Sequence, residues 1–211
     1  MRKRNIAIIV IALMQSPATL ARPVSYPGGW TVMQMHNRAN TSVHLHYSPS
    51  ARHSVGVRGF HIRDKNAFAG ALQVNVLLKR VNNRESQANL YFKGGGGAAW
   101  DNDDISFTGF SGLAADWETR RLFIRYENRV GTIGGRENSF RQSARAGLAP
   151  YVADFGSLHT WLMLEVSHYP STDYEDKTEI TPLARFFKGD SLFEIGWSFN
   201  GKLTLNFIRR F

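Results

Sequence analysis

Apolar and polar residues alternate with a period of two along most of this chain, and helical periodicity is nearly absent. The clearest run is ALQVNVLLK, in which Leu72, Val74 and Val76 share one face and Gln73 and Asn75 share the other. Similar runs, such as QANLYFK, RLFIRYE and TWLMLEVS, are separated by segments rich in Gly, Asn, Asp, Ser or Pro. The pattern predicts an all-β fold of about twelve antiparallel strands, with roughly eight or ten as alternatives.

The last of these runs, NGKLTLNFIRRF, allows its strand register to be tested. A two-residue turn at Asn200 and Gly201 would place Glu194 beside Phe207 and mix the two faces. A three-residue loop from Phe199, with Gly201 as the left-handed bulge residue, makes one face wholly apolar. Its pairs are Trp197 with Leu203, Ile195 with Leu205 and Phe193 with Phe207. This register leaves one basic residue, Arg209, on the apolar face, where it should lie near the strand end and reach the head groups.

Two architectures fit many alternating strands without helices. A soluble periplasmic β-sandwich or lipocalin-like binding protein would turn its apolar face inward. A transmembrane β-barrel would turn that face to lipid and its polar face to the lumen. The polar face is rich in Arg, Glu, Asn and Gln, and short and long connections alternate, with GGGG at 94–97 expected to end a strand. These features favour a single antiparallel transmembrane barrel.

The N-terminal segment has the layout of a secretory signal peptide. Arg2, Lys3 and Arg4 precede a short apolar run, and small residues follow as far as Ala21. The run is shorter than the roughly 20 residues of a membrane-spanning helix. We therefore expect a cleaved signal peptide at 1–21 and one barrel domain at 22–211.

Composition narrows the function classes. The sequence has no cysteine, which excludes disulfides and thiolate metal sites. The formal net charge is +9, and three of the 26 basic residues lie in the expected signal peptide. The remaining charge is ordinary for an exported protein and does not indicate a nucleic-acid partner.

The C-terminal strand resembles the terminal signal of Gram-negative outer-membrane β-barrels. In that class the last residue is aromatic and alternate preceding residues are apolar, as Leu203, Leu205, Phe207 and Phe211 are here. The resemblance implies recognition by the β-barrel assembly machinery and a location among outer-membrane lipid and lipopolysaccharide. The segments YPGGWTVMQMHNRANTSVHLHYSP and VLLKRVNNRESQANLYFK also resemble an uncharacterised proteobacterial family, which implies no activity.

The inward face of such a barrel would be strongly charged. No recognisable catalytic motif accompanies it, and GGGG lacks the Lys-Ser or Lys-Thr of a phosphate-binding loop. We expect a non-enzymatic outer-membrane barrel that is either a narrow channel for small solutes, with an anion preference, or a filled structural barrel. The expected lumen-lining residues are Arg58, Lys79, Lys93, Arg125, Glu127, Arg141, Arg145, Glu165, Arg185 and Glu194.

A metal-handling barrel is the alternative function. Met33, Met35, His44 and His46 offer thioether and imidazole ligands, which suit copper(I); otherwise no cofactor is expected. In one strand register, the two methionines face inward opposite the histidines. In the other they face lipid beside Val43 and Leu45, which is energetically simpler and is the register we expect.

Overall fold

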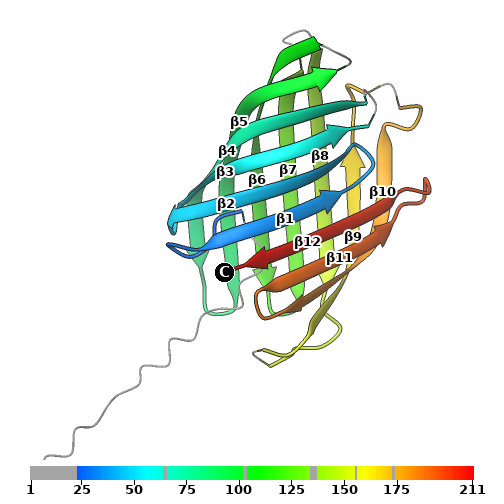
Figure 1. Cartoon of the computed structure of the whole chain (residues 1–211). Helices are drawn as coiled ribbons and strands as arrows, with labels where there is room; N and C mark the ends of the chain where they lie inside the picture. Colours follow the sequence, from blue (N-terminus) through cyan, green and yellow to red (C-terminus); the bar gives the residue numbers. More distant parts are fainter. Residues whose placement is uncertain (1–22, 64–65, 102–103, 134–136, 155, 173) are drawn as a thin grey trace, which may run out of the picture.

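The computed structural model is a closed β-barrel of twelve strands (Figure 1). It describes residues 23–63, 66–101, 104–133, 137–154, 156–172 and 174–211, so the expected signal peptide lies outside the described residues. The strands are β1 Trp30–His36, β2 Asn40–Ser50, β3 His53–Ile62, β4 Ala67–Asn82, β5 Ser86–Asp101, β6 Asp104–Thr119, β7 Leu122–Ile133, β8 Glu137–Leu148, β9 His159–His168, β10 Thr178–Lys188, β11 Ser191–Trp197 and β12 Leu203–Arg210. The predicted all-β fold and strand number are confirmed.

Each strand pairs antiparallel with the next, and β1 pairs with β12 to close the sheet. At this seam Thr31 lies opposite Arg210. Two backbone hydrogen bonds extend the seam, from Trp30 N to Phe211 O at 2.8 Å and from Phe211 N to Trp30 O at 3.0 Å. The sheet therefore has no open edge.

The two faces of the sheet differ in polarity as the alternation predicts. Large apolar side chains point outward and stay exposed; Leu72, for example, is 70% exposed and Leu162 is 58% exposed. The polar side chains at the alternate positions point inward and are buried; Asn75 is 0% exposed and His46 is 1% exposed. An exterior of exposed Leu, Ile, Val and Phe would be unstable in water, and it matches the hydrocarbon core of a membrane. No helix long and apolar enough to span a membrane occurs in the described part of the chain.

The last hairpin has the predicted register and turn. Phe193 pairs with Phe207 and Trp197 with Leu203, and Gly201 has a φ of 72°. Arg209 points outward beside Ser191, the first residue of β11. The guanidinium carbon of Arg209 lies 5.9 Å from the centre of the Phe211 ring. This basic side chain thus sits at one end of the barrel, as expected.

Two expectations about the strands are wrong. A β-bulge in β4 lets Leu77 pair with Tyr91 and Lys79 with Leu90, so Leu78 is an extra residue. The bulge shifts the alternation by one residue, and Lys79 lies exposed on the outer side rather than in the lumen. The glycines at 94–97 do not end a strand but lie within β5, which continues to Asp101.

A short segment before β1 enters the barrel at the end where β12 finishes. Val24 is 4% exposed and packs against the inward side chains Leu77, Tyr91 and Ala114. The Ser54 hydroxyl donates a hydrogen bond of 2.8 Å to Pro23 O, and Ser25 N donates one of 3.0 Å to Ser48 Oγ. These contacts fix residues 23–25 against the inner wall, where they narrow this end of the lumen.

Candidate solute pathway inside the barrel

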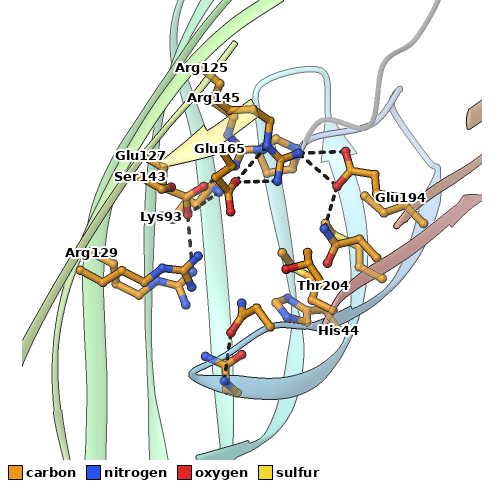
Figure 2. Close-up of a pocket in the computed structure, with 18 of the residues that line it drawn as sticks. His44, Lys93, Arg125, Glu127, Arg129, Ser143, Arg145, Glu165, Glu194 and Thr204 are labelled. Atoms are coloured by element: carbon orange, nitrogen blue, oxygen red, sulfur yellow. Dashed lines mark hydrogen bonds and ion pairs between the residues drawn. The ribbon is translucent and has the colours of Figure 1, made fainter. Parts of the chain in front are cut away.

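The barrel interior contains a polar cavity of about 110 Å³ (Figure 2). Because one water molecule needs about 10–15 Å³ of cavity volume, the cavity can hold several waters or a small solute. Nine of the ten predicted lumen residues line it, and Lys79 does not. The nine are Arg58, Lys93, Arg125, Glu127, Arg141, Arg145, Glu165, Arg185 and Glu194.

One ion-pair network is centred on Glu127 of β7. Lys93 Nζ of β5 lies 2.9 Å from Glu127 Oε1, and Arg129 Nη2 lies 3.8 Å from the same oxygen. Arg125, two residues before Glu127 and on the same face, binds the other oxygen. A single carboxylate thus holds three cations on one side of the cavity, on the left in Figure 2.

A second network crosses from β8 to β12. Arg145 donates to Glu165 Oε2 at 2.6 Å and to Glu194 Oε1 at 2.9 Å. Arg185 Nε lies 2.6 Å from Glu194 Oε1, and the Asn206 amide donates to Glu194 Oε2 at 2.7 Å. Glu194 is therefore satisfied at both oxygens, which compensates the cost of burying its charge.

The carboxylates do not balance the cations of the cavity. Seven basic side chains line it against three acidic ones, an excess of four positive charges. Arg58 and Arg141 have no carboxylate partner among the described residues. Aromatic rings support them instead, since Arg58 lies 4.8 Å from the centre of Phe60 and Arg141 lies 5.4 Å from that of Tyr169.

Sequence reasoning missed three inward carboxyl groups outside this cavity. Asp116, Glu118 and Glu179 are on inward positions of β6 and β10, and Glu118 and Glu179 are buried. The Asp116 carboxylate accepts a hydrogen bond of 2.7 Å from Asn89. The alternation through Ile180 places Glu179 on the inward face. Asp116 and Glu118 lie in the segment ADWE, whose composition is typical of a turn although the structure places it in β6.

The register between β1 and β2 is not the one expected. Met33 pairs with His44 and Met35 with Ser42, so both methionines face inward, and they line the cavity with His44 and His46. Met33 packs against an inward apolar cluster of Phe187, Leu192 and Ile208, which compensates for its absence from the lipid side. Among the described residues, no group of three or more His, Cys, Asp or Glu is placed to hold a metal ion.

Comparison with known proteins gives a structural likeness only. No protein family and no curated protein matches the sequence. The barrel resembles a KdgM porin. The solved structure of the KdgM porin in complex with disordered oligogalacturonate has a TM-score of 0.51 and 8% identity, over 87% of this chain and 98% of that one. A second KdgM porin structure has a TM-score of 0.49 and 7% identity, again over 87% of this chain and 98% of that one. The first of these two likenesses supports the twelve-strand barrel architecture.

Proposed function

We propose that this protein is a non-catalytic outer-membrane channel that passes small solutes and prefers anions. The excess of four positive charges in the cavity lining is the observation that carries the proposal. A narrow passage with walls of low dielectric constant focuses the field of such charges, which lowers the energy of an anion and raises that of a cation.

The two ion-pair networks keep the passage narrow. Arg145 bridges Glu165 on β9 and Glu194 on β11, so it ties distant parts of the wall together. Lys93 of β5 and Glu127 of β7 do the same on the other side. Residues 23–25 occupy further space at one end. We therefore expect small hydrated anions and small organic acids to pass, with a low conductance.

The structural likeness is consistent with an anionic solute. The KdgM porin of the first comparison is in complex with oligogalacturonate, a chain of sugar acids. The present chain shares the barrel architecture of that porin at 8% identity, and its own support for an anionic solute comes from the charge of its cavity.

Planar-bilayer recording tests the proposal. The purified protein should give small, stable conductance steps in potassium chloride, and the reversal potential in a salt gradient should have the sign of chloride permeation. The double variant Arg58→Gln/Arg141→Gln should shift this potential toward zero, because it removes the two cations that lack a carboxylate partner. The exposed pair Arg84→Gln/Lys79→Gln is the matched control. A silent protein would point to a filled structural barrel, and cation selectivity would contradict the proposal.

We also propose that the barrel is exported to the outer membrane and folded there by the β-barrel assembly machinery, with lipid and lipopolysaccharide around its exterior. The apolar residues of the proposed recognition signal, Leu203, Leu205 and Phe207, alternate with the buried Thr204 and Asn206. They therefore face outward along β12, the strand that forms the closing seam.

A further inference from the structure

We propose that His44, His46 and Arg58 form a binding subsite for one small oxyanion, a carboxylate or a phosphate group carried by the solute. The subsite rests on the proposed function, since it names the chemistry of the permeating anion. The three side chains point inward from β2 and β3, where His44 pairs directly with Arg58. All three line the central cavity, together with Lys93 and Arg129.

Each of the three has a buried nitrogen without a hydrogen-bond partner among the described residues. These atoms are His44 Nδ1, His46 Nε2 and Arg58 Nε. The residues are 4%, 1% and 5% exposed, so all three lie away from the barrel surface. A buried polar group without a partner costs about 1–3 kcal/mol in general, so a ligand that accepts hydrogen bonds from all three would gain binding energy at this cavity.

A chain of hydrogen bonds fixes where His46 carries its proton. Pro23 O can only accept, so the Ser54 hydroxyl donates its single proton there, at 2.8 Å. Ser54 Oγ must then accept from Asn75 Nδ2, at 2.9 Å, which sets the orientation of the Asn75 amide. The same amide nitrogen lies 3.4 Å from His46 Nδ1, which therefore accepts. The His46 proton is left on Nε2, the nitrogen without a partner.

His44 and Arg58 supply the other two unpartnered nitrogens. Ser42 Oγ lies 2.9 Å from His44 Nε2, and when this hydroxyl donates, the His44 proton resides on Nδ1. Arg58 Nε always carries a hydrogen. The His44 and His46 rings are 5.6 Å apart between their centres. His46 Nε2–H, Arg58 Nε–H and, with Ser42 as donor, His44 Nδ1–H are thus donors of residues that line the same cavity, and together with the positive charge of Arg58 they suit an oxyanion.

The same protonation argues against a cation in this place. A metal ion needs the lone pair of an imidazole nitrogen. The hydrogen bonds through Asn75 place a proton on Nε2 of His46, the nitrogen that lacks a partner. Arg58 and Lys93 would repel a cation. The Met33 side chain is packed in an apolar cluster, as an ordinary interior methionine is.

The neighbouring residues hold the subsite in shape. Gly56 pairs with His46, and a Cβ at Gly56 would lie 2.0 Å from Leu45 O and 2.7 Å from the His46 ring atom Cδ2, so the glycine allows both the backbone of β2 and the ring to lie close. The Arg58 guanidinium lies 4.8 Å from the centre of Phe60 and 5.5 Å from that of Phe110. These rings limit the positions of Arg58 without using its hydrogen bonds. Figure 2 shows His44 apart from the ion pairs of Glu127 and Glu194.

Calorimetric titration of the full-length protein, refolded in detergent, tests the subsite. Inorganic phosphate and acetate are the two probes, which separate a phosphate group from a carboxylate. His46→Asn places an amide oxygen near the position of Nδ1 as an acceptor for Asn75 and removes the Nε2 donor, and Arg58→Gln removes the charge. Each should weaken binding of the preferred probe by about tenfold or more. The controls are His53→Asn, at the exposed start of β3, and Arg84→Gln, at the exposed turn after β4, and both should bind as the wild type does.

Histidine-labelled wild-type protein gives a measurement that requires no folded variant. Nitrogen NMR should show His46 as the Nε2–H tautomer, with a resonance that moves when the probe anion is added. A Nδ1–H tautomer, or equal binding in wild type and the two variants, would overturn the proposal. So would copper(I) binding that depends on His46. The result is independent of conductance: phosphate binding to a silent protein would reject only the channel, and anion selectivity without such binding would reject only the subsite.

Discussion

At the scale of single residues, buried carboxylates organise the interior of this barrel. Glu194 is 3% exposed and accepts hydrogen bonds from Arg145, Arg185 and Asn206. The cost of burying one such charge is high, and it is offset only when the partners are close and well oriented. The carboxylate thus holds two guanidinium groups that would otherwise repel each other.

Replacing this carboxylate should destabilise the barrel more than its size suggests. Glu194→Gln is nearly isosteric but leaves Arg185 without its carboxylate partner. We expect the free energy of unfolding to fall by about 3 kcal/mol, because the variant leaves a charge buried and uncompensated. Urea titration of the refolded protein in lipid vesicles measures the change. Glu85→Gln, at an exposed turn, should change it by no more than about 0.5 kcal/mol, and an equal effect of both variants would contradict the structural role.

The alternation was sufficient to place nine inward charged residues, because each lies in a run whose outer face is unmistakably apolar. It was not sufficient for Asp116, which lies in a segment of turn-forming composition. Partners could not be predicted either. The pairing of Glu194 with Arg145 joins residues 49 positions apart, and nothing in the local pattern encodes that distance.

At the scale of elements, the bulge in β4 is a local exception to the alternation. Both Leu78 and Lys79 are exposed on the outer side, opposite Leu90. From sequence, a run of two leucines before a lysine gave no sign that one of them is unpaired. A bulge is a property of two paired strands, so a single strand read by itself does not reveal it.

Deleting Leu78 should therefore be tolerated. The deletion leaves Leu77 opposite Tyr91 and the next residue opposite Leu90, so every other side chain keeps its face. Deleting Val74 in the regular part of the same strand should move several inward residues to the lipid side, because one step in register exchanges the faces. The heat-modifiable shift of the refolded protein on a gel measures folding. Loss of this shift in the Leu78 deletion, or its retention in the Val74 deletion, would contradict the assigned bulge.

The register of β1 against β2 shows a second limit of sequence reasoning. A methionine side chain that faces lipid is favourable by itself, so the sequence predicted that Met33 and Met35 face outward. The structure has Met33 inward because Phe187, Leu192 and Ile208 form an apolar cluster inside the barrel. That cluster is assembled from β10, β11 and β12, so its effect on β1 exists only after the sheet has closed.

At the scale of the whole molecule, the assembly proposal predicts different behaviour in cells and in the test tube. Phe211→Ala removes an exposed aromatic ring beside the seam, so it should lower the amount of folded protein in outer-membrane fractions several-fold. The purified variant should still refold in detergent, because the ring packs on the outside. Phe199→Ala, in the turn at the other end of the same hairpin, is the control. Equal amounts of both variants in the membrane would contradict recognition of this strand.

The seam between β1 and β12 has a kinetic consequence. Its partners, such as Thr31 and Arg210, are almost a full chain length apart, so closure is the contact with the largest loop entropy to overcome. Such high contact order slows folding, and a curved sheet that is complete except for its seam carries two unpaired edges. Those edges can pair with other chains during that interval. We therefore expect that, until β1 meets β12, a chaperone or a lipid surface must keep both edges of the nascent sheet from aggregating.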